Sequence, residues 1–216
     1  TIKCVLNLHT PDRGRAAVLG CDSRQLGPAQ FRQIGYVSEN QELPLWMTVP
    51  ELIAYCRPMY PTWDDAFADQ LLRQFNLPRA TKIKALSRGM RMKAALLSSL
   101  AYRPRLVILD EPFSGLDPLV RDDFIRGLLE LTELEGWSVF VSSHDIAEVE
   151  RLADRVAILN RGRLELHEAA ADLQARFRAV EVVRNAEAAL PLDLPPSWLN
   201  VEVAGRVVRF TESRYA

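Results

Sequence analysis

The sequence is poor in cysteine, in net charge and in long apolar runs. Its three cysteines, Cys4, Cys21 and Cys56, are odd in number and lack metal-ligand spacing, so we expect reduced, buried thiols. A formal net charge of −1 argues against a nucleic-acid binder that works through bulk positive charge. No apolar stretch approaches the ~20 residues that a membrane span needs, and no secretory leader is visible. Together these absences predict a soluble intracellular domain, which would reach a membrane only through a partner.

Strand-like and helix-like patterns alternate along most of the chain. With 216 residues, of which 48% are hydrophobic, the chain can bury the core of one domain and carry an appendage. Short apolar runs predict strands at residues 16–19, 33–37, 106–109, 138–141 and 156–159. Helical patterns predict helices at residues 50–55, 63–75, 87–102, 118–134 and 145–152. Such alternation is typical of a parallel sheet with helices on its faces.

The final part of the chain has a different pattern. A helix is expected near residues 168–177, followed by a strand at 180–183 and a proline-rich connector at 190–196. Residues 201–208 predict a hairpin that turns at Ala204 and Gly205. We therefore expect a small β-rich appendage, and we favour a stabilising cap over a regulatory or dimer-contacting role.

The most informative segment is an apolar run, residues 106–109, that leads directly into Asp110 and Glu111. A short unbroken apolar run predicts a strand buried on both faces, and open α/β sheets bind ligands beyond the carboxyl ends of such strands. Two carboxylates there are costly to desolvate unless a cation or a proton transfer offsets the cost. One can hold Mg²⁺ and the other can orient or deprotonate a water that attacks a phosphate. The acidic pair alone is also compatible with an ordinary loop after a core strand.

The surrounding motifs favour the phosphate chemistry. A signature-like segment, the acidic strand and a strand ending in a histidine follow one another in the order found in the ATP-binding subunits of ABC transporters, and the chain resembles this family over residues 1–170, approximately. The matching segments are 86–90 (Leu-Ser-Arg-Gly-Met) for the signature LSGGQ, 106–111 for the Walker B strand, 114–117 (Ser-Gly-Leu-Asp) for the D-loop, 34–39 for the strand leading into the Q-loop, and His144 for the switch histidine.

The resemblance implies a fold class and a division of the chain. The fold would be α/β, a P-loop NTPase-type mostly parallel sheet with helices on both faces, a helical insertion subdomain and a small C-terminal β-rich appendage. The four expected segments are the N-terminal part of the ATPase core (1–38), the Q-loop and helical subdomain with the signature (39–103), the core with Walker B, D-loop and switch histidine (104–177), and the appendage (178–216).

The resemblance also implies roles for the acidic strand end. Asp110 would hold Mg²⁺, often through a water, and Glu111 would polarise the attacking water. His144 would hydrogen-bond the γ-phosphate of ATP and help to fix Glu111. A histidine near a strand end is often only solvated, and we interpret His9 and His167 in that way.

The signature segment allows an argument from charge. Helix N-termini favour acidic residues, yet the helix after Ser87 begins with Arg88 and Gly89, which is reasonable if an anion docks there. The Ser87 hydroxyl and the Gly89 N–H would then face a phosphate, by resemblance that of the nucleotide on a second protomer, and Asp117 would position groups across the same interface or cap a helix. The arginine can alternatively be a solvated surface charge. Arg88 replaces the first glycine of the signature, and Met90 replaces its glutamine.

Glu39 is a further departure, because the family usually has glutamine at this position. Its expected task is to contact Mg²⁺ or the attacking water and to report the nucleotide state to the membrane subunit. A shifted register would give this task to Gln41.

One element of nucleotide-binding chains of this kind is missing. The loop G-x-x-x-x-G-K-[ST] cradles phosphates with backbone N–H groups and a lysine, but no Gly-Lys dipeptide occurs in this sequence. By motif alignment, Thr1 falls about three positions past the expected lysine. We therefore expect a chain cut inside its ATP-binding site, which would bind and hydrolyse ATP poorly by itself; a degenerate protein that lost the loop is the alternative.

The resemblance predicts an ATPase that drives transport through a separate membrane-spanning subunit at the cytoplasmic face of the membrane. ATP and Mg²⁺ would lie in a head-to-tail homodimer or pseudo-dimer, and no nucleic acid would be bound. The segment 48–78 is similar to exporter subunits, and the apolar side chains of Trp46 and Met47 are candidates for a groove that receives a helix of the membrane subunit. The alternatives are a non-transport ABC ATPase in translation or DNA repair, and an inactive regulatory paralogue.

Overall fold

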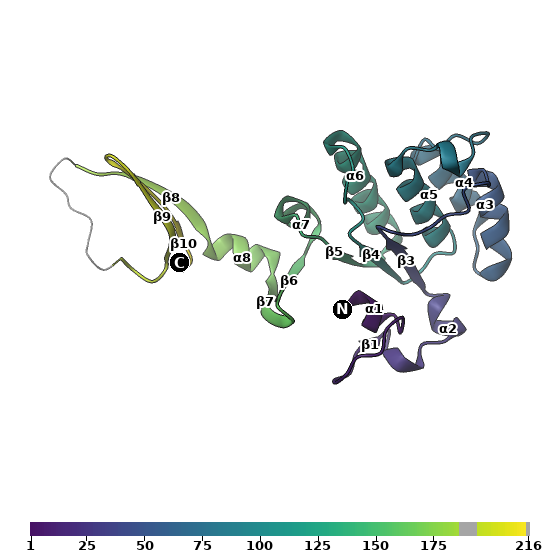
Figure 1. The fold of residues 1–216 in the computed structure, drawn as a ribbon, viewed down its shortest axis with the longest axis horizontal. Helices are drawn as coiled ribbons and strands as arrows, with labels where there is room; N and C mark the ends of the chain where they lie inside the picture. Colours follow the sequence, from purple (N-terminus) through teal and green to yellow (C-terminus); the bar gives the residue numbers. More distant parts are fainter. Residues whose placement is uncertain (186–193, 215–216) are drawn as a thin grey trace. The chain divides into compact units, whose positions relative to one another are not determined.

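The computed structural model describes residues 1–185 and 194–214, which form two compact units, Thr1–Glu148 and Val149–Ala216. The ribbon of both units is drawn in Figure 1. In the described residues no helix combines the length and the apolar character needed to cross a bilayer. The three cysteines are free thiols, as expected, but each is partly exposed rather than buried.

The first unit is built on a three-stranded parallel sheet in the order β3–β4–β5. Its strands are β3 (Ile34–Ser38), β4 (Leu106–Asp110) and β5 (Ser138–Ser142). The central strand β4 buries the three side chains of residues 107–109 completely, which confirms the prediction of a strand covered on both faces. Full burial of each such side chain contributes about 1.5–3 kcal/mol. The register aligns Ser38, Asp110 and Ser142, so all three strands end at one edge.

Helices α3 (Val49–Cys56), α4 (Asp65–Gln74) and α5 (Arg88–Leu100) occupy the region predicted to be helical. Side chains placed before each helix cap its first turn. Thr48 forms a capping box with Glu51, and Asp64 accepts a hydrogen bond from the Phe67 N–H at 2.9 Å. These caps fix where the helices begin, which is why the predicted starts agree with the structure to within two residues.

Helix α5 lies against β3, next to α4 (Figure 1). The Ser99 hydroxyl donates to the Tyr36 carbonyl at 3.0 Å, and the Tyr102 hydroxyl donates to the Ile34 carbonyl at 2.7 Å. Gly35 permits this approach, since a Cβ there would lie 2.6 Å from the Ser99 carbonyl oxygen. The start of α5 also packs against α6 (Pro118–Glu135).

The beginning of the chain folds beside the sheet as short elements. These are α1 (Ile2–Val5), β1 (Ala17–Val18), β2 (Cys21–Asp22) and α2 (Pro28–Phe31). The strand expected at 16–19 is present but short, and β2 and α2 were not predicted. An apolar cluster joins this segment to the sheet; its buried members are Ile2, Leu6, Val18, Leu26, Ile34 and Ile108. Helix α7 (Ile146–Leu152) spans the division between the two units.

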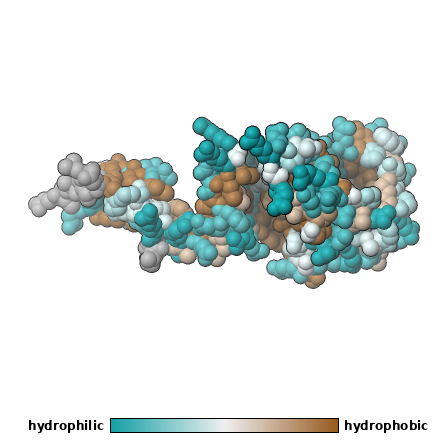
Figure 2. Space-filling view, turned by 90° about the horizontal axis from the view of Figure 1, so that it is seen from below, coloured by the Kyte–Doolittle hydropathy of each residue, from teal (hydrophilic) through white to brown (hydrophobic). Residues whose placement is uncertain are grey.

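The second unit contains two antiparallel sheets separated by α8 (Ala170–Arg176). The strands are β6 (Arg155–Asn160) paired with β7 (Arg163–Ala169), then β8 (Arg178–Val183), β10 (Val207–Glu212) and β9 (Trp198–Ala204), in the order β8–β10–β9. Trp198 stacks on Phe210 with ring centroids 3.8 Å apart. The hairpin predicted at residues 201–208 is confirmed by the pairing of β9 with β10. Apolar side chains of this unit also reach its surface (Figure 2). The connector predicted at 190–196 lies mostly outside the described residues.

Two features of the second unit differ from the sequence prediction. The pattern at 156–159 predicts a strand of the parallel sheet, but among the described residues β6 pairs with β7 alone, in a separate hairpin. Strand β7 was missed, although Leu164 and Leu166 alternate with polar residues. The two compact units divide between Glu148 and Val149. The four predicted segments stay predictions.

Candidate active site

Asp110 and Glu111 lie at the carboxyl end of β4, where Ser142 of β5 connects them. Asp110 and Ser142 are register partners at the ends of adjacent strands. The Ser142 hydroxyl donates to Asp110 Oδ1 at 2.7 Å and accepts from the Glu111 N–H at 3.1 Å. The same N–H also lies 3.2 Å from the Ser142 carbonyl oxygen. One hydroxyl therefore orients both acidic residues. This role of Ser142 was not predicted from the sequence. The signal for it is that Ser142 ends the strand next to the one that ends at Asp110.

The Glu111 carboxylate meets the His144 imidazole. Glu111 Oε2 lies 2.8 Å from His144 Nδ1, so the structure brings together the two predicted catalytic residues. The hydrogen bond that His144 donates to Glu111, followed by the negative charge of Glu111, raises the pKa of His144. The imidazole is 78% exposed, which leaves its other edge accessible. Glu111 adopts φ +52°, a conformation uncommon outside glycine that is enriched at functional sites.

A second cluster supports the loop that carries His144. Arg121 of α6 lies 2.9 Å from Asp145 Oδ2 and 3.1 Å from Glu148 Oε1, and the Ser143 hydroxyl hydrogen-bonds Glu148. The Glu148 side chain is 7% exposed, so its charge needs this arginine for compensation. The cluster holds the histidine loop against α6. This cluster could not be predicted from the sequence, because its members are polar residues of types that are ordinary on exposed helices.

Glu39 lies at the same sheet edge, beyond β3. Its N–H donates to the Asp110 carbonyl at 2.9 Å, which places the loop after β3 beside the acidic strand end. Its Oε1 accepts from the Ser114 hydroxyl at 2.7 Å and from Arg88 Nη2 at 2.9 Å. The Ser114 hydroxyl, followed by the Arg88 guanidinium, lowers the pKa of Glu39. Gln41, the alternative in a shifted register, is exposed and lies two residues further along the loop.

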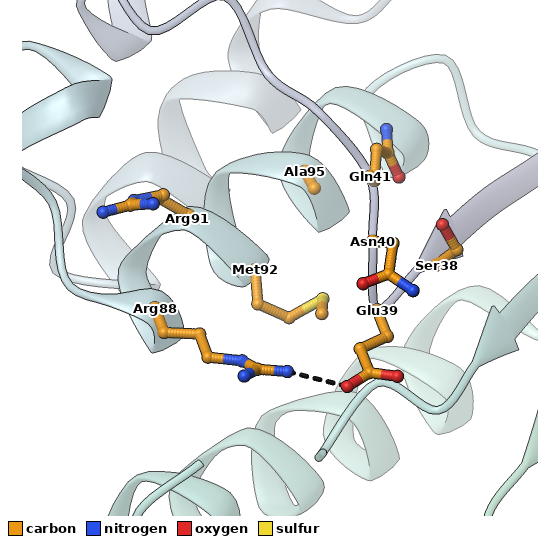
Figure 3. A pocket seen from close by; sticks show the side chains of 8 residues that line it. All are labelled: Ser38, Glu39, Asn40, Gln41, Arg88, Arg91, Met92 and Ala95. Atoms are coloured by element: carbon orange, nitrogen blue, oxygen red, sulfur yellow. Dashed lines mark hydrogen bonds and ion pairs between the residues drawn. The ribbon is translucent and has the colours of Figure 1, made fainter. Parts of the chain in front are cut away.

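A hollow of about 310 Å³ separates the loop after β3 from the start of α5. Figure 3 shows Glu39 and Arg88 pointing toward one another across it. Its lining residues are Ser38, Glu39, Asn40, Gln41, Arg88, Arg91, Met92 and Ala95. The charged pair forms one side of this hollow.

The signature residues have structural tasks in the chain itself. Ser87 is exposed and caps α5, because its Oγ accepts from the Met90 N–H at 3.2 Å. Gly89 is buried, and a Cβ on it would lie 2.7 Å from Val120 Cγ1, so only glycine lets α5 approach α6 this closely. This burial gives the glycine a packing reason in addition to the expected contact of its N–H with a phosphate. Asp117 is exposed and caps α6 by accepting from the Leu119 N–H at 3.0 Å.

The oxygen ligands at this edge match the chemistry of Mg²⁺. Protein sites commonly hold Mg²⁺ through one or two carboxylates, with waters and substrate phosphates completing the octahedron. Within residues 1–185 and 194–214, no three histidine, cysteine, aspartate or glutamate residues are grouped to hold a metal. Asp110, whose carboxylate is oriented by the Ser142 hydroxyl, is a candidate for such a single-carboxylate contact.

Comparison with known proteins gives concordant matches. The model of the ABC transporter family matches residues 1–114. The chain is 31% identical over 166 residues to the uncharacterized ABC transporter ATP-binding protein YdbJ of Bacillus subtilis (76% of this chain, 54% of that protein). It is 36% identical over 173 residues to the sulfate/thiosulfate import ATP-binding protein CysA of Xanthomonas campestris (76% and 50%). The chain thus spans about half the length of these relatives.

A solved structure has the same fold. The ATP-binding subunit of an ABC transporter superposes with a TM-score of 0.68 at 27% identity, covering 80% of this chain and 74% of that one. The match supports the assignment of a P-loop NTPase-type α/β core.

Proposed function

Because the chain belongs to the ABC transporter family of ATP-binding proteins, we propose that it hydrolyses ATP and couples hydrolysis to transport through a separate membrane-spanning subunit. The observation that carries this proposal is the contact of 2.8 Å between Glu111 and His144 beside Asp110. Glu111 is a carboxylate that could polarise water, His144 could orient it, and Asp110 is a carboxylate that could hold a metal. All three lie at the edge where parallel sheets bind ligands.

Each side chain has a distinct task in this proposal. Asp110 would hold Mg²⁺, directly or through a water, and bound Mg²⁺ would neutralise charge on the phosphate oxygens. Glu111 accepts a hydrogen bond from the attacking water and polarises it. His144 holds Glu111 through Nδ1, so that Nε2 can donate to a γ-phosphate oxygen. The raised pKa of His144 favours the protonated form, which also stabilises developing negative charge.

We further propose that two such domains bind ATP between them as a head-to-tail homodimer or pseudo-dimer. Ser87 and Asp117 are exposed, and they begin α5 and α6 respectively. Both can therefore be reached by a second subunit, where Ser87 and the adjacent Gly89 would contact its nucleotide and Asp117 would position groups of its site.

The membrane subunit would bind beside the helical region. Trp46 is 69% exposed and Leu45 is 47% exposed, while the backbone on either side is held by hydrogen bonds from Ile83 and Lys84. A fixed loop that presents an indole suits the capture of an amphipathic helix, and Met47 lies partly buried behind it. Attachment through this surface would place the protein at the cytoplasmic face of the membrane. Export is proposed from residues 48–78 alone; one relative is named as an import protein.

Replacement of Glu111 by glutamine in the complete gene product tests the proposed function. The amide keeps the shape but loses the basicity, so ATPase turnover is expected to fall by about 10²–10⁴-fold, while ATP binding persists. ATP that can bind but not react should accumulate in a dimer, which sedimentation velocity would detect. Unchanged turnover would remove Glu111 from the mechanism.

A further inference from the structure

Three segments of the first unit meet at the Glu39 carboxylate. Glu39 follows β3, Arg88 is the first residue of α5, and Ser114 belongs to the loop after β4. Glu39 Oε1 accepts from Arg88 Nη2 at 2.9 Å and from Ser114 Oγ at 2.7 Å, and the Arg88 pair is visible in Figure 3. One oxygen atom thus connects the start of the signature helix with both loops at the sheet edge.

The Arg88 guanidinium also rests on the loop after β4. A Cβ on Gly115 would lie 2.6 Å from Arg88 Nη1 and 2.8 Å from Cζ, so the absence of a side chain there makes room for the guanidinium. Gly115 has φ +65°, a conformation that glycine adopts readily. Arginine suits this place better than lysine, because its flat fork can lie on backbone and still reach the carboxylate.

Glu39 and Arg88 are the two charged departures that the sequence shows from the motifs it resembles. Alone, Glu39 would add a third carboxylate beside Asp110 and Glu111, and like charges at one edge repel. Alone, Arg88 would add a cation to the signature helix. Together they form an ion pair, so each departure provides the physical reason for the other.

We propose that Arg88 is a positioning residue that holds Glu39 as a latch between the start of α5 and the loops after β3 and β4, and so keeps Glu39 from acting as a metal ligand. The inference rests on the proposed function only in taking Asp110 as the carboxylate that holds the metal. A metal ion at Glu39 and the guanidinium of Arg88 would compete for the negative charge of the same carboxylate. Binding of the ion by Glu39 would therefore weaken the pair and loosen the start of α5.

The exposure of the pair suits a contact that opens and closes. The side chains of Arg88 and Glu39 are 51% and 33% exposed, so water and salt weaken the pair. A buried pair would be too costly to break in every cycle, since separation would leave a desolvated charge behind. The latch is thus strong enough to bias the position of α5 and weak enough to be released by a divalent ion.

The latch is tested without ATP hydrolysis, by amide hydrogen exchange on Arg88→Gln, Glu39→Gln and the double variant. Each single substitution should speed exchange at Met90, Arg91 and Ser114, whose N–H groups bond within the latched segments. The double variant should match the single ones, because both remove one interaction. Arg79→Gln is the matched control: it removes an arginine from an exposed pair with Asp69 at 2.7 Å, and should leave these amides unchanged.

Binding of Mn²⁺ alone, followed by electron paramagnetic resonance, tests the competition. Arg88→Gln should tighten Mn²⁺ binding about two- to fivefold, the factor expected for release of an exposed ion pair. The double variant, which also carries Glu39→Gln, should lack that gain. Asp110→Asn should weaken Mn²⁺ binding in every background.

Two outcomes overturn the latch: additive exchange effects in the double variant, or a loss of Mn²⁺ affinity in Glu39→Gln as large as that in Asp110→Asn. Neither outcome depends on turnover. A failed latch would therefore leave the proposed function standing, and normal turnover in Glu111→Gln would overturn that function without affecting the latch.

Discussion

Two glutamates at one sheet edge are held by basic side chains of different kinds. Glu39 follows β3 and accepts from Arg88 at 2.9 Å, whereas Glu111 follows β4 and contacts His144 at 2.8 Å. The guanidinium stays charged at every physiological pH, but the imidazole can gain or lose a proton. The comparison shows that similar distances give different chemistry: an arginine fixes a carboxylate as an anion, while a histidine leaves it within reach of proton transfer.

The backbone supports the two carboxylates differently as well. The Glu111 N–H is held by both the carbonyl and the hydroxyl oxygen of Ser142, and its φ is positive. The Glu39 N–H has one strand partner, the Asp110 carbonyl, and its side chain reaches a helix in the helical region. Glu111 is thus suited to a fixed chemical position, and Glu39 to a contact that connects separate segments.

Replacement of His144 or Arg88 by alanine gives the largest expected difference in turnover between the two pairs. In the complete gene product, His144→Ala should lower turnover by about 100-fold, because Glu111 loses its orienting partner and the phosphate loses a positive group. Arg88→Ala should lower it less than about tenfold, since an exposed ion pair contributes little. Steady-state ATPase rates measure both. Equal losses would mean that the two pairs do not differ in role.

A side chain at Gly89 should disturb the Glu39–Arg88 pair and leave the Glu111–His144 pair unchanged. A Cβ there would lie 2.7 Å from Val120 Cγ1, so Gly89→Ala should push α5 away from α6 and cost about 1–3 kcal/mol of folding stability. Urea unfolding measures the loss, and the double variant with Val120→Ala should recover part of it. Mn²⁺ binding should change as in Arg88→Gln, while the pKa of His144 stays constant; a shift in that pKa would show that the pairs are coupled.

The Ser142 hydroxyl supports Asp110 and Glu111 rather than the Glu39–Arg88 pair. Ser142→Ala removes a hydrogen bond to Asp110 Oδ1 and one from the Glu111 N–H, and should cost about 1 kcal/mol. Ser138→Ala, at the exposed start of the same strand, is the matched control and should be near neutral. Thermal unfolding of the two variants gives the difference. Equal melting temperatures would argue against the orienting role.

The smallest effect is a titration shift. The hydrogen bond and charge of Glu111 stabilise the imidazolium, so the pKa of His144 should lie above 6.5 and fall in Glu111→Gln. Because the folded-state pKa is raised, this pair supports the fold below pH 6.5 and ceases to do so as pH rises through the folded value. NMR titration of the His144 imidazole protons measures the shift, by comparison of the unmodified chain with Glu111→Gln. Arg88→Gln should leave the His144 titration unchanged.

Local patterns were sufficient for much of the fold. The apolar run before Asp110 predicted β4, and cap residues such as Ser87 predicted where helices begin, because these signals depend on neighbours along the chain. The strand at 156–159 was predicted but placed in the parallel sheet instead of the β6–β7 hairpin, because an apolar run contains no information about which strand it pairs with. The candidate site followed the same rule: Asp110, Glu111 and His144 were predicted, but Ser142 and the Arg121–Glu148 cluster were not.

The sequence by itself determined the three strands of the parallel sheet, the main helices around them, and the presence of acids, an imidazole and a signature-like helix start. Only the tertiary structure decided the other partners: Ser142 for Asp110, and Arg88 with Ser114 for Glu39. The physical reason is distance along the chain. Caps and apolar periodicity act within a few residues, whereas Glu39 and Arg88 lie 49 positions apart and meet only after β3, β4 and α5 have packed.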